Sequence, residues 1–159
     1  MNGCMTSIMI LGLSEELAET VRRTRRDALG NHDLTERVVR EPHSAPCRVC
    51  LRDAEVGEAV LLMGHSPFTV ATPYRTVGPI FIHAARCVPF AGGEVPEALR
   101  RRLLSVRAHD RAGRLLDSDV TPGEGLAALA ERLLAVPGAA ELHVHHARPG
   151  CFACRIVAP

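Results

Sequence analysis

Short apolar runs alternate with polar positions along most of the chain, and glycine, proline or aspartate separates one run from the next. Runs of this length between turn residues are typical of β-strands. A short β-like piece over residues 36–40 fits the same pattern. The sequence therefore predicts about eight strands, over residues 7–13, 47–52, 59–65, 79–86, 103–110, 114–120, 141–147 and 151–157.

Two segments have the period of helices instead. The first is predicted to begin after Ser14, a preferred N-cap, and to end at Gly30. Its apolar positions, such as Leu17 and Val21, share one face, and we expect its arginines to lie on the helix surface. Those arginines could contact acidic partners, although such side chains more often only cover apolar area.

The second predicted helix has the clearest local signal in the chain. Thr121, Pro122 and Glu124 form a capping-box pattern, and leucines then recur with a period of 3.6 residues as far as Pro137. With hairpin connections outnumbering crossovers, the sequence predicts one α+β domain. We expect a largely antiparallel sheet of about 7–8 strands and two main helices.

Composition agrees with a single folded domain. The 159 residues are 47% hydrophobic, 23% charged and only 3% aromatic, which predicts an aliphatic core. Met5 is an alternative start, so the domain is predicted to cover residues 5–159, with residues 1–4 as an N-terminal extension. No signal peptide or membrane-spanning run is visible in the sequence.

Charge excludes several classes of function. All 19 cationic side chains are arginine, and the absence of lysine excludes Schiff-base chemistry, pyridoxal attachment and a Walker-type phosphate site. A net charge of +1 gives no general attraction to nucleic acid or to an anionic membrane, so we expect neither as a partner. We expect a bacterial, cytoplasmic protein whose six cysteines remain reduced.

The cysteines include two CxxC pairs, Cys47 with Cys50 and Cys151 with Cys154. Two such pairs can form a tetrahedral zinc site. They are about a hundred residues apart, however, far more than in an ordinary zinc ribbon. Residues three apart on a regular strand also point to opposite faces, so each pair would need a turn to converge. Small buried thiols are the simpler interpretation of these pairs.

His143 and His145 are two residues apart in a predicted strand and therefore share one face. Two such imidazoles can bind one transition metal such as zinc, with Cys50 as a nearby third ligand. One or two of Cys47, Cys50 and Cys151 would complete the ligand set. The alternative is that both imidazoles only form local hydrogen bonds on a partly solvated face of the sheet.

Three hypotheses for function follow. The first is an enzymatic or small-molecule-binding site in which a thiolate acts as nucleophile or redox centre and an imidazole as base. The second is the metal-binding module just described, and the third is a non-catalytic interaction or regulatory domain that forms a homodimer. For the first, the candidate catalytic residues are Cys50, His83, His145 and Cys151, and the candidate anion-binding residues are Arg48 and Arg107.

Several short motifs follow one another along the chain in a characteristic order and spacing. They are Pro46-Cys47-Arg48-Val49-Cys50-Leu51-Arg52-Asp53-Ala54, Gly57-Glu58, Val60-Leu61-Leu62, Pro73-Tyr74, Gly78-Pro79-Ile80-Phe81, His83, Cys87, His143-Val144-His145, Ala147 and Gly150-Cys151-Phe152-Ala153. This set resembles a bacterial family of domains of unknown function, number 1203, from about Ile8 to Ile156. The resemblance implies domain limits and a bacterial source, but no reaction.

Overall fold

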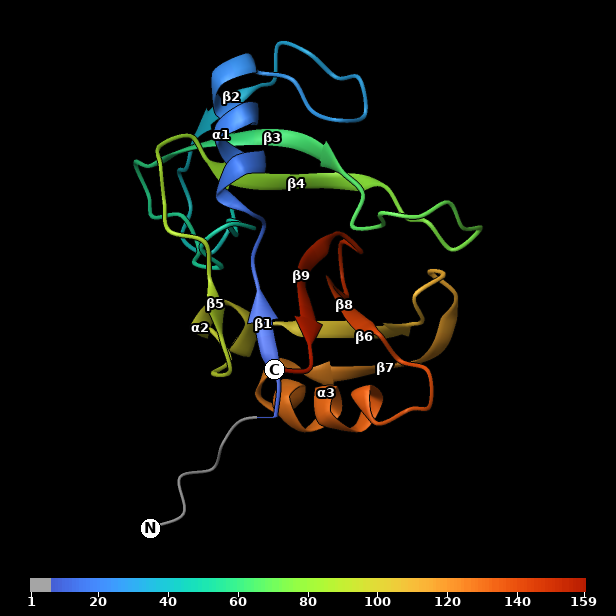
Figure 1. Ribbon diagram of the computed structural model, residues 1–159. Coiled ribbons are helices and arrows are strands. Elements are labelled where there is room, and N and C mark those ends of the chain that lie inside the picture. Colours follow the sequence, from blue (N-terminus) through green and yellow to red (C-terminus); the bar gives the residue numbers. More distant parts are fainter. Residues whose placement is uncertain (1–6) are drawn as a thin grey trace.

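The computed structural model describes residues 7–159 and contains two antiparallel sheets (Figure 1). The large sheet has the order β5-β1-β9-β8-β6-β7, and the small sheet has the order β2-β3-β4. The strands are β1 (Met9–Leu11), β2 (Glu36–Val38), β3 (Ala59–His65), β4 (Gly78–His83), β5 (Ala91–Gly92), β6 (Leu103–His109), β7 (Leu115–Pro122), β8 (Glu141–His146) and β9 (Phe152–Val157). The helices are α1 (Glu15–Thr24), α2 (Glu97–Arg100) and α3 (Leu126–Leu134), and a 3-10 turn, η1 (Gly123–Gly125), precedes α3.

The predicted α+β class with mainly antiparallel strands is therefore confirmed, although the strands form two sheets and not one. The chain folds as one domain. The predicted boundary at residue 5 and the extension over residues 1–4 lie outside the described residues. Along residues 7–159, no helix has the length and apolar character needed to cross a membrane.

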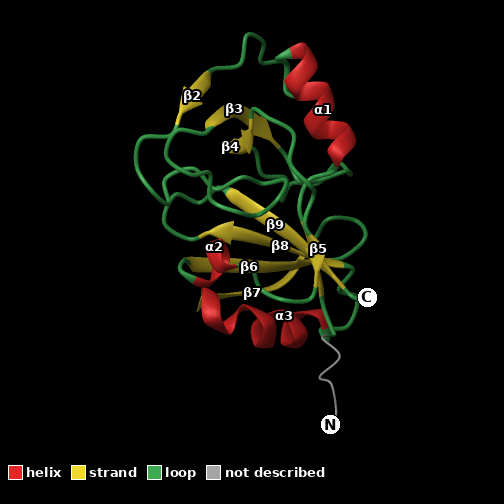
Figure 2. Ribbon diagram, turned by 90° about the vertical axis from the view of Figure 1, so that its left-hand side faces the viewer, coloured by secondary structure: helices red, strands yellow, loops and turns green. Residues whose placement is uncertain are grey.

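Each sheet buries one face under a helix. Figure 2 shows α3 beneath the large sheet and α1 beside the small one. Leu104 and Val144 of the large sheet pack in one core with Leu133 of α3, whereas Leu61 of the small sheet packs in a second core with Val21 of α1. Phe152 belongs to the large sheet but packs in the second core, so the two sheets are in direct contact.

Residues 47–52 form a turn, so the predicted strand there is wrong. The amide of Leu51 donates to the carbonyl of Cys47 at 3.0 Å, and the amide of Cys47 donates to the carbonyl of Arg52 at the same distance. Leu51 has φ +57°, in the left-handed region. The apolar side chains in this run are buried by the two cores and not by the alternation of a strand, which is why the sequence pattern misleads.

The predicted helix boundaries also differ from the structure. Thr121 and Pro122 pair with β6 at the end of β7, so Thr121 is not an N-cap, and α3 begins only at Leu126. The sheet satisfies the backbone of Thr121 before a helix can begin there. The first helix is shorter than predicted, because Arg25 adopts a left-handed conformation with φ +54° and ends α1 well before Gly30.

Candidate metal centre

Four metal-ligating side chains meet between α1 and the small sheet. Cys47 and Cys50 lie in the turn after β2, His83 is the last residue of β4, and Cys87 lies in the loop that follows β4. One ligand atom from each residue lies within 4.8 Å of all the others. Among residues 7–159, this is the group of three or more such side chains that could hold one metal ion.

Two of the distances between ligand atoms in this Cys3His cluster have the length expected for a tetrahedral site. Cys47 Sγ lies 3.8 Å from Cys87 Sγ, and Cys50 Sγ lies 3.5 Å from His83 Nδ1. Zinc–sulfur and zinc–nitrogen bonds of about 2.3 and 2.0–2.1 Å place two sulfurs about 3.8 Å apart and a sulfur and a nitrogen about 3.5 Å apart. Both distances therefore match the edges of a tetrahedron around one zinc-sized ion.

Backbone contacts hold the Cys47–Cys50 turn in place. The amides of Val49 and His83 donate to Cys47 Sγ at 3.4 and 3.3 Å, so the sulfur faces two N–H groups. On the outer side of the turn, the amide of Leu13 donates to the carbonyl of Arg48 at 2.8 Å, and the amide of Phe90 donates to the carbonyl of Val49 at 2.9 Å. The turn is thus fixed to the end of β4 through His83, and to the segments next to β1 and β5 through Leu13 and Phe90.

The other ring nitrogen of His83 is also occupied. His83 Nε2 lies 2.9 Å from Glu58 Oε2, and Arg52 pairs with Glu58 at 3.1 Å. The hydrogen bond from Arg52 is the main reason that the pKa of Glu58 falls to about 2, so this carboxylate is charged. A charged carboxylate can accept a hydrogen bond from the Nε2–H group of His83. In a neutral His83 with its proton on Nε2, the lone pair of Nδ1 lies on the side of Cys50, whose Sγ is 3.5 Å away. A carboxylate behind a histidine in this way is typical of metal-ligating histidines.

The three thiols differ in how readily each one loses its proton. Hydrogen bonds from Cys50 and Cys87 lower the pKa of Cys47, while the interaction with Cys47, followed by burial, raises the pKa of both Cys50 and Cys87. The crowding therefore favours one thiolate at the expense of the other two. A cation at the centre of the cluster would relieve this competition, since it stabilises every thiolate that binds it.

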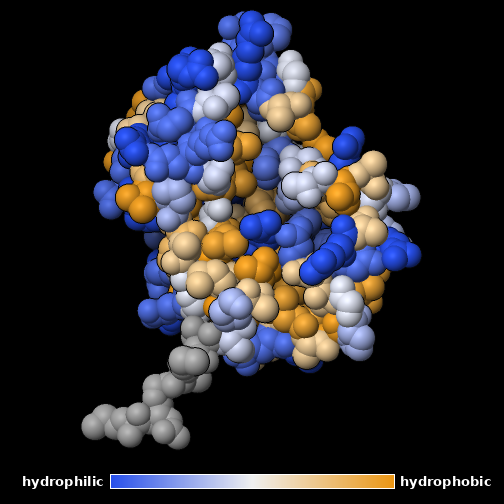
Figure 3. Space-filling view, viewed as in Figure 1, coloured by the Kyte–Doolittle hydropathy of each residue, from blue (hydrophilic) through white to orange (hydrophobic). Residues whose placement is uncertain are grey.

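Arg22 of α1 supplies positive charge next to the cluster. Its Nη2 donates to Cys87 Sγ at 3.4 Å and its Nε donates to the carbonyl of His83 at 3.0 Å. The side chain is only 8% exposed. The expectation that the arginines of this helix lie on its surface is therefore wrong for Arg22, while the hydrophilic end of the molecule in Figure 3 contains the exposed part of α1.

The structure brings together two of the residues singled out in the sequence as catalytic candidates, Cys50 and His83. Of the other two, Cys47 is only an alternative ligand in the sequence prediction, and Cys87 is not among the predicted ligands. The signal that could have found the set is a CxxC pair followed by histidine and cysteine four residues apart, because ligand pairs of metal sites commonly have such short spacers.

His143 and His145 do share one face of β8, since both rings contact Phe152, but they lie outside the cluster. His143 Nε2 pairs with Glu141 at 2.8 Å. His145 Nδ1 donates to the carbonyl of Gly150 at 2.9 Å, and its Nε2 lies 3.5 Å from Arg107. These contacts correspond to the local hydrogen bonding that the sequence left open as an alternative.

Arg48 and Cys151 form a separate contact. Arg48 Nη2 donates to Cys151 Sγ at 3.0 Å, and Arg48 is only 2% exposed although it stands between two residues of the Cys3His cluster in sequence. Cys154, the partner of Cys151 in the second CxxC pair, points into the large-sheet core. The second pair therefore does not converge, as the strand phase predicts.

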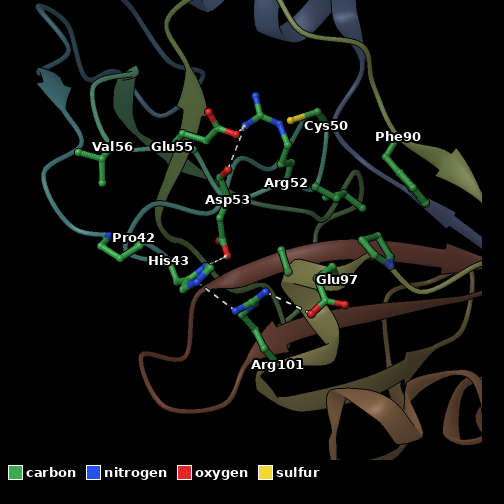
Figure 4. A pocket seen from close by; sticks show the side chains of 14 residues that line it. Pro42, His43, Cys50, Arg52, Asp53, Glu55, Val56, Phe90, Glu97 and Arg101 are labelled. Carbon is green, nitrogen blue, oxygen red and sulfur yellow. Dashed lines mark hydrogen bonds and ion pairs between the residues drawn. The ribbon is translucent and has the colours of Figure 1, made fainter.

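A cavity of about 400 Å³ adjoins the cluster at Cys50 (Figure 4). Ion pairs and hydrogen bonds tie its polar walls together: His43 contacts both Asp53 and Arg101, and Arg101 pairs with Glu97. Arg52 contacts the carbonyl of Asp53 on the other side. The polar groups here satisfy one another.

The fold and the cluster define a two-sheet α+β domain with a Cys3His group between α1 and the small sheet. The chain belongs to the family described as "Protein of unknown function (DUF1203)", whose model matches residues 44–157. The match includes all four cluster residues but begins after β1 and α1, later than the start near Ile8 expected from the resemblance. No curated protein and no solved structure matches the chain.

Proposed function

We propose that Cys47, Cys50, His83 and Cys87 bind one zinc ion. The observation that carries this proposal is the agreement of the Cys47–Cys87 and Cys50–His83 distances with the edges of a zinc tetrahedron. Thiolate and imidazole are also the ligands that favour zinc over magnesium or calcium, which prefer oxygen.

Charge supports the same assignment. Three thiolates and one Zn²⁺ leave a net charge of −1, and Arg22, which also pairs with Glu19 at 2.8 Å, donates a charge-assisted hydrogen bond to Cys87 Sγ. The amides that face Cys47 Sγ stabilise negative charge on that sulfur in the same way. A cluster built only to bury neutral thiols needs neither the arginine nor the carboxylate behind His83.

The proposed role of the ion is structural. Four protein ligands complete a tetrahedral site and leave no open position for a substrate. The ligands come from the turn after β2 and from both the end and the following loop of β4. The ion would therefore link these segments and fix the turn on which Arg48 stands. Three zinc-bound thiolates also suit a compartment in which thiols stay reduced, such as a bacterial cytoplasm.

The test is the metal content of protein purified without a histidine tag and under reducing conditions. We expect one zinc ion per chain by elemental analysis. Replacement of zinc by cobalt is expected to give the visible spectrum of a tetrahedral, thiolate-rich site. Cys87→Ala removes one ligand and is expected to weaken zinc binding by at least tenfold in a competition with a chromophoric chelator.

Cys151→Ser is the matched control, since it also removes one thiol but lies outside the cluster. It is expected to keep one zinc ion per chain. The proposal is overturned if protein reconstituted with zinc under reducing conditions binds no stoichiometric ion, or if Cys87→Ala binds zinc as tightly as the unchanged protein. Stoichiometric iron with no zinc would overturn the choice of metal.

A further inference from the structure

A second cavity, of about 700 Å³, lies between the two sheets and away from the Cys3His ligands. Its walls come from the small sheet on one side and from the start of β6 and the β8–β9 turn on the other. This volume lies within the range of sites that bind small organic molecules. None of the four proposed zinc ligands lines it.

The polar part of this cavity is entirely cationic or neutral. Four arginines line it, namely Arg48, Arg101, Arg102 and Arg148, and no aspartate or glutamate does. Two of the four are already neutralised: Arg102 forms a bidentate pair with Asp53 at 2.8 and 3.1 Å, and Arg101 pairs with Glu97 at 3.2 Å. The positive charge that remains is that of Arg48 and Arg148.

Arg48 is a buried cation that contacts no carboxylate. Its Nε and Nη1 donate to the carbonyls of Phe152 and Pro46 at 2.7 and 2.6 Å, and its Nη2 donates to Cys151 Sγ. Burial lowers the pKa of Arg48. These contacts use three of the five N–H groups of a guanidinium and leave one on each terminal nitrogen. A buried charge without a counter-ion is costly, which favours an anion at this position.

Two more side chains on the large-sheet side are available to a ligand. His146 is only 4% exposed, and its Nδ1 has no hydrogen-bond partner among the described residues. Arg148 is exposed in the turn after β8 and takes part in none of the ion pairs found between residues 7 and 159. Both residues line the cavity together with Arg48.

The opposite wall is apolar. Leu62, Ile80 and Phe81 of the small sheet face the cavity, and Leu103 and Pro149 extend the apolar surface. We propose that this cavity binds a small organic anion whose carboxylate or phosphate group lies at Arg48 and Arg148 and whose apolar body packs against Leu62 and Phe81. The site requires no reaction, and none of the four proposed zinc ligands would contact the anion.

Cys151 provides a direct measure of occupancy, because it lines the same cavity and contacts Arg48. The experiment follows the alkylation of Cys151 by iodoacetamide, located by peptide mass spectrometry, with benzoate, phenyl phosphate or benzamide present. Benzoate and phenyl phosphate are expected to slow the reaction in a saturable way. Benzamide has the size and shape of benzoate but no charge, and it is expected to give no protection. The two anions show whether the site prefers a carboxylate or a phosphate.

Two arginine variants locate the anion. Arg148→Gln removes an exposed charge and is expected to weaken binding by about three- to fivefold. Arg111→Gln makes the same change in an exposed turn that does not line the cavity, and it is expected to leave binding unchanged. Arg48→Gln is expected to weaken binding by about tenfold or more, provided that its spectrum is that of folded protein.

Calorimetry with Cys151→Ser checks that binding does not depend on the reporter thiol. Three outcomes each overturn the proposal: no saturable protection by either anion, equal protection by benzamide, or equal affinities of the Arg148→Gln and Arg111→Gln proteins. Loss of all benzoate binding in Cys151→Ser would also overturn it, since the thiol rather than the arginines would then hold the ligand.

Discussion

Cys47 and Cys87 are 40 residues apart in sequence, yet their sulfur atoms lie 3.8 Å apart. Pairing of β3 with β4 brings them together, because it carries His83 and the loop after it back to the Cys47–Cys50 turn. The cluster is therefore a product of the small sheet. Residues behind the four proposed ligands should then control how tightly a metal ion is held.

Glu58→Gln tests the carboxylate behind His83. The change keeps the size of the side chain but removes the charge that fixes the His83 ring. Loss of such a carboxylate typically costs 10–100-fold in metal affinity. We expect zinc affinity to fall by about tenfold or more, measured in competition with a chelator. Glu55→Gln is the control, since Glu55 contacts Arg52 only at 3.8 Å and does not touch His83. Equal zinc affinities of the two variants would contradict the role assigned to Glu58.

Gly12→Ala tests the packing behind the Cys47–Cys50 turn. A Cβ atom at Gly12 would lie 2.0 Å from the carbonyl oxygen of Val49, where only backbone can yield. We expect the free energy of unfolding to fall by about 1–3 kcal/mol in urea denaturation, which is the usual cost of overpacking. Gly78→Ala is the control, because a Cβ there meets nothing within 4 Å and its φ is not positive. A stability of Gly12→Ala equal to that of the control would show that the turn is not fixed against β1.

The buried side chain of His145 is expected to make the stability of the protein depend on pH. Burial is the main reason that its pKa in the folded protein falls to about 4, whereas the ordinary value is 6.5. Below pH 6.5 the unfolded chain binds a proton that the folded protein does not, so stability is complete above pH 6.5 and is lost as the pH falls toward 4. One such proton corresponds to a slope of up to about 1.4 kcal/mol per pH unit.

His145→Gln removes this proton. Its free energy of unfolding is therefore expected to fall less between pH 7 and 5 than that of the unchanged protein, when both are measured by urea denaturation at the same zinc concentration. Acid release of zinc affects the two proteins alike and cancels in the comparison. Parallel pH profiles for the two proteins would contradict the expectation.

Periodicity predicted the strands well but failed at the cluster. The phase of β8 correctly separates Leu142 and Val144, which face the core, from His143 and His145. Cys154 lies in the large-sheet core and apart from Cys151, but β9 does not alternate strictly, since Ala153 lies in the same core and Phe152 in the other. Alternation is a local property of a strand, and the register shift between β8 and β9 interrupts it here.

Strand alternation also predicts that Cys47 and Cys50, which have the same spacing as Cys151 and Cys154, point to opposite faces. This prediction is wrong, because both thiols belong to the cluster. Residues 47–52 read as an apolar strand, but they bend because contacts from distant segments, at Leu13, Phe81 and Phe90, pair with their backbone. Cys87 lies in a loop with no periodic pattern. Periodicity gives no sign that either segment meets His83. The short spacings within Cys47–Cys50 and within His83–Cys87 indicate two ligand pairs, but only the tertiary fold brings the pairs together.

The proposed zinc ion and the proposed anion share one link, which is Arg48. It stands between Cys47 and Cys50, so the turn that carries two zinc ligands also positions the guanidinium in the cavity. Removal of zinc by a chelator is therefore expected to weaken benzoate binding. Linkage requires the reverse effect to be equal, so saturating benzoate should raise zinc affinity by the same factor. That factor is typically about 5–150 for coupled sites.

The reverse measurement starts from the zinc-loaded form, so benzoate binding does not have to be measured on metal-free protein. Transfer of zinc to a chelator is expected to slow when benzoate is present and to remain unchanged with benzamide. Arg111→Gln should behave as the unchanged protein does, whereas Arg48→Gln should lose the effect of benzoate. If benzoate binds but leaves zinc transfer unchanged, the carbonyls of Pro46 and Phe152 alone hold Arg48 in position, and the two sites act independently.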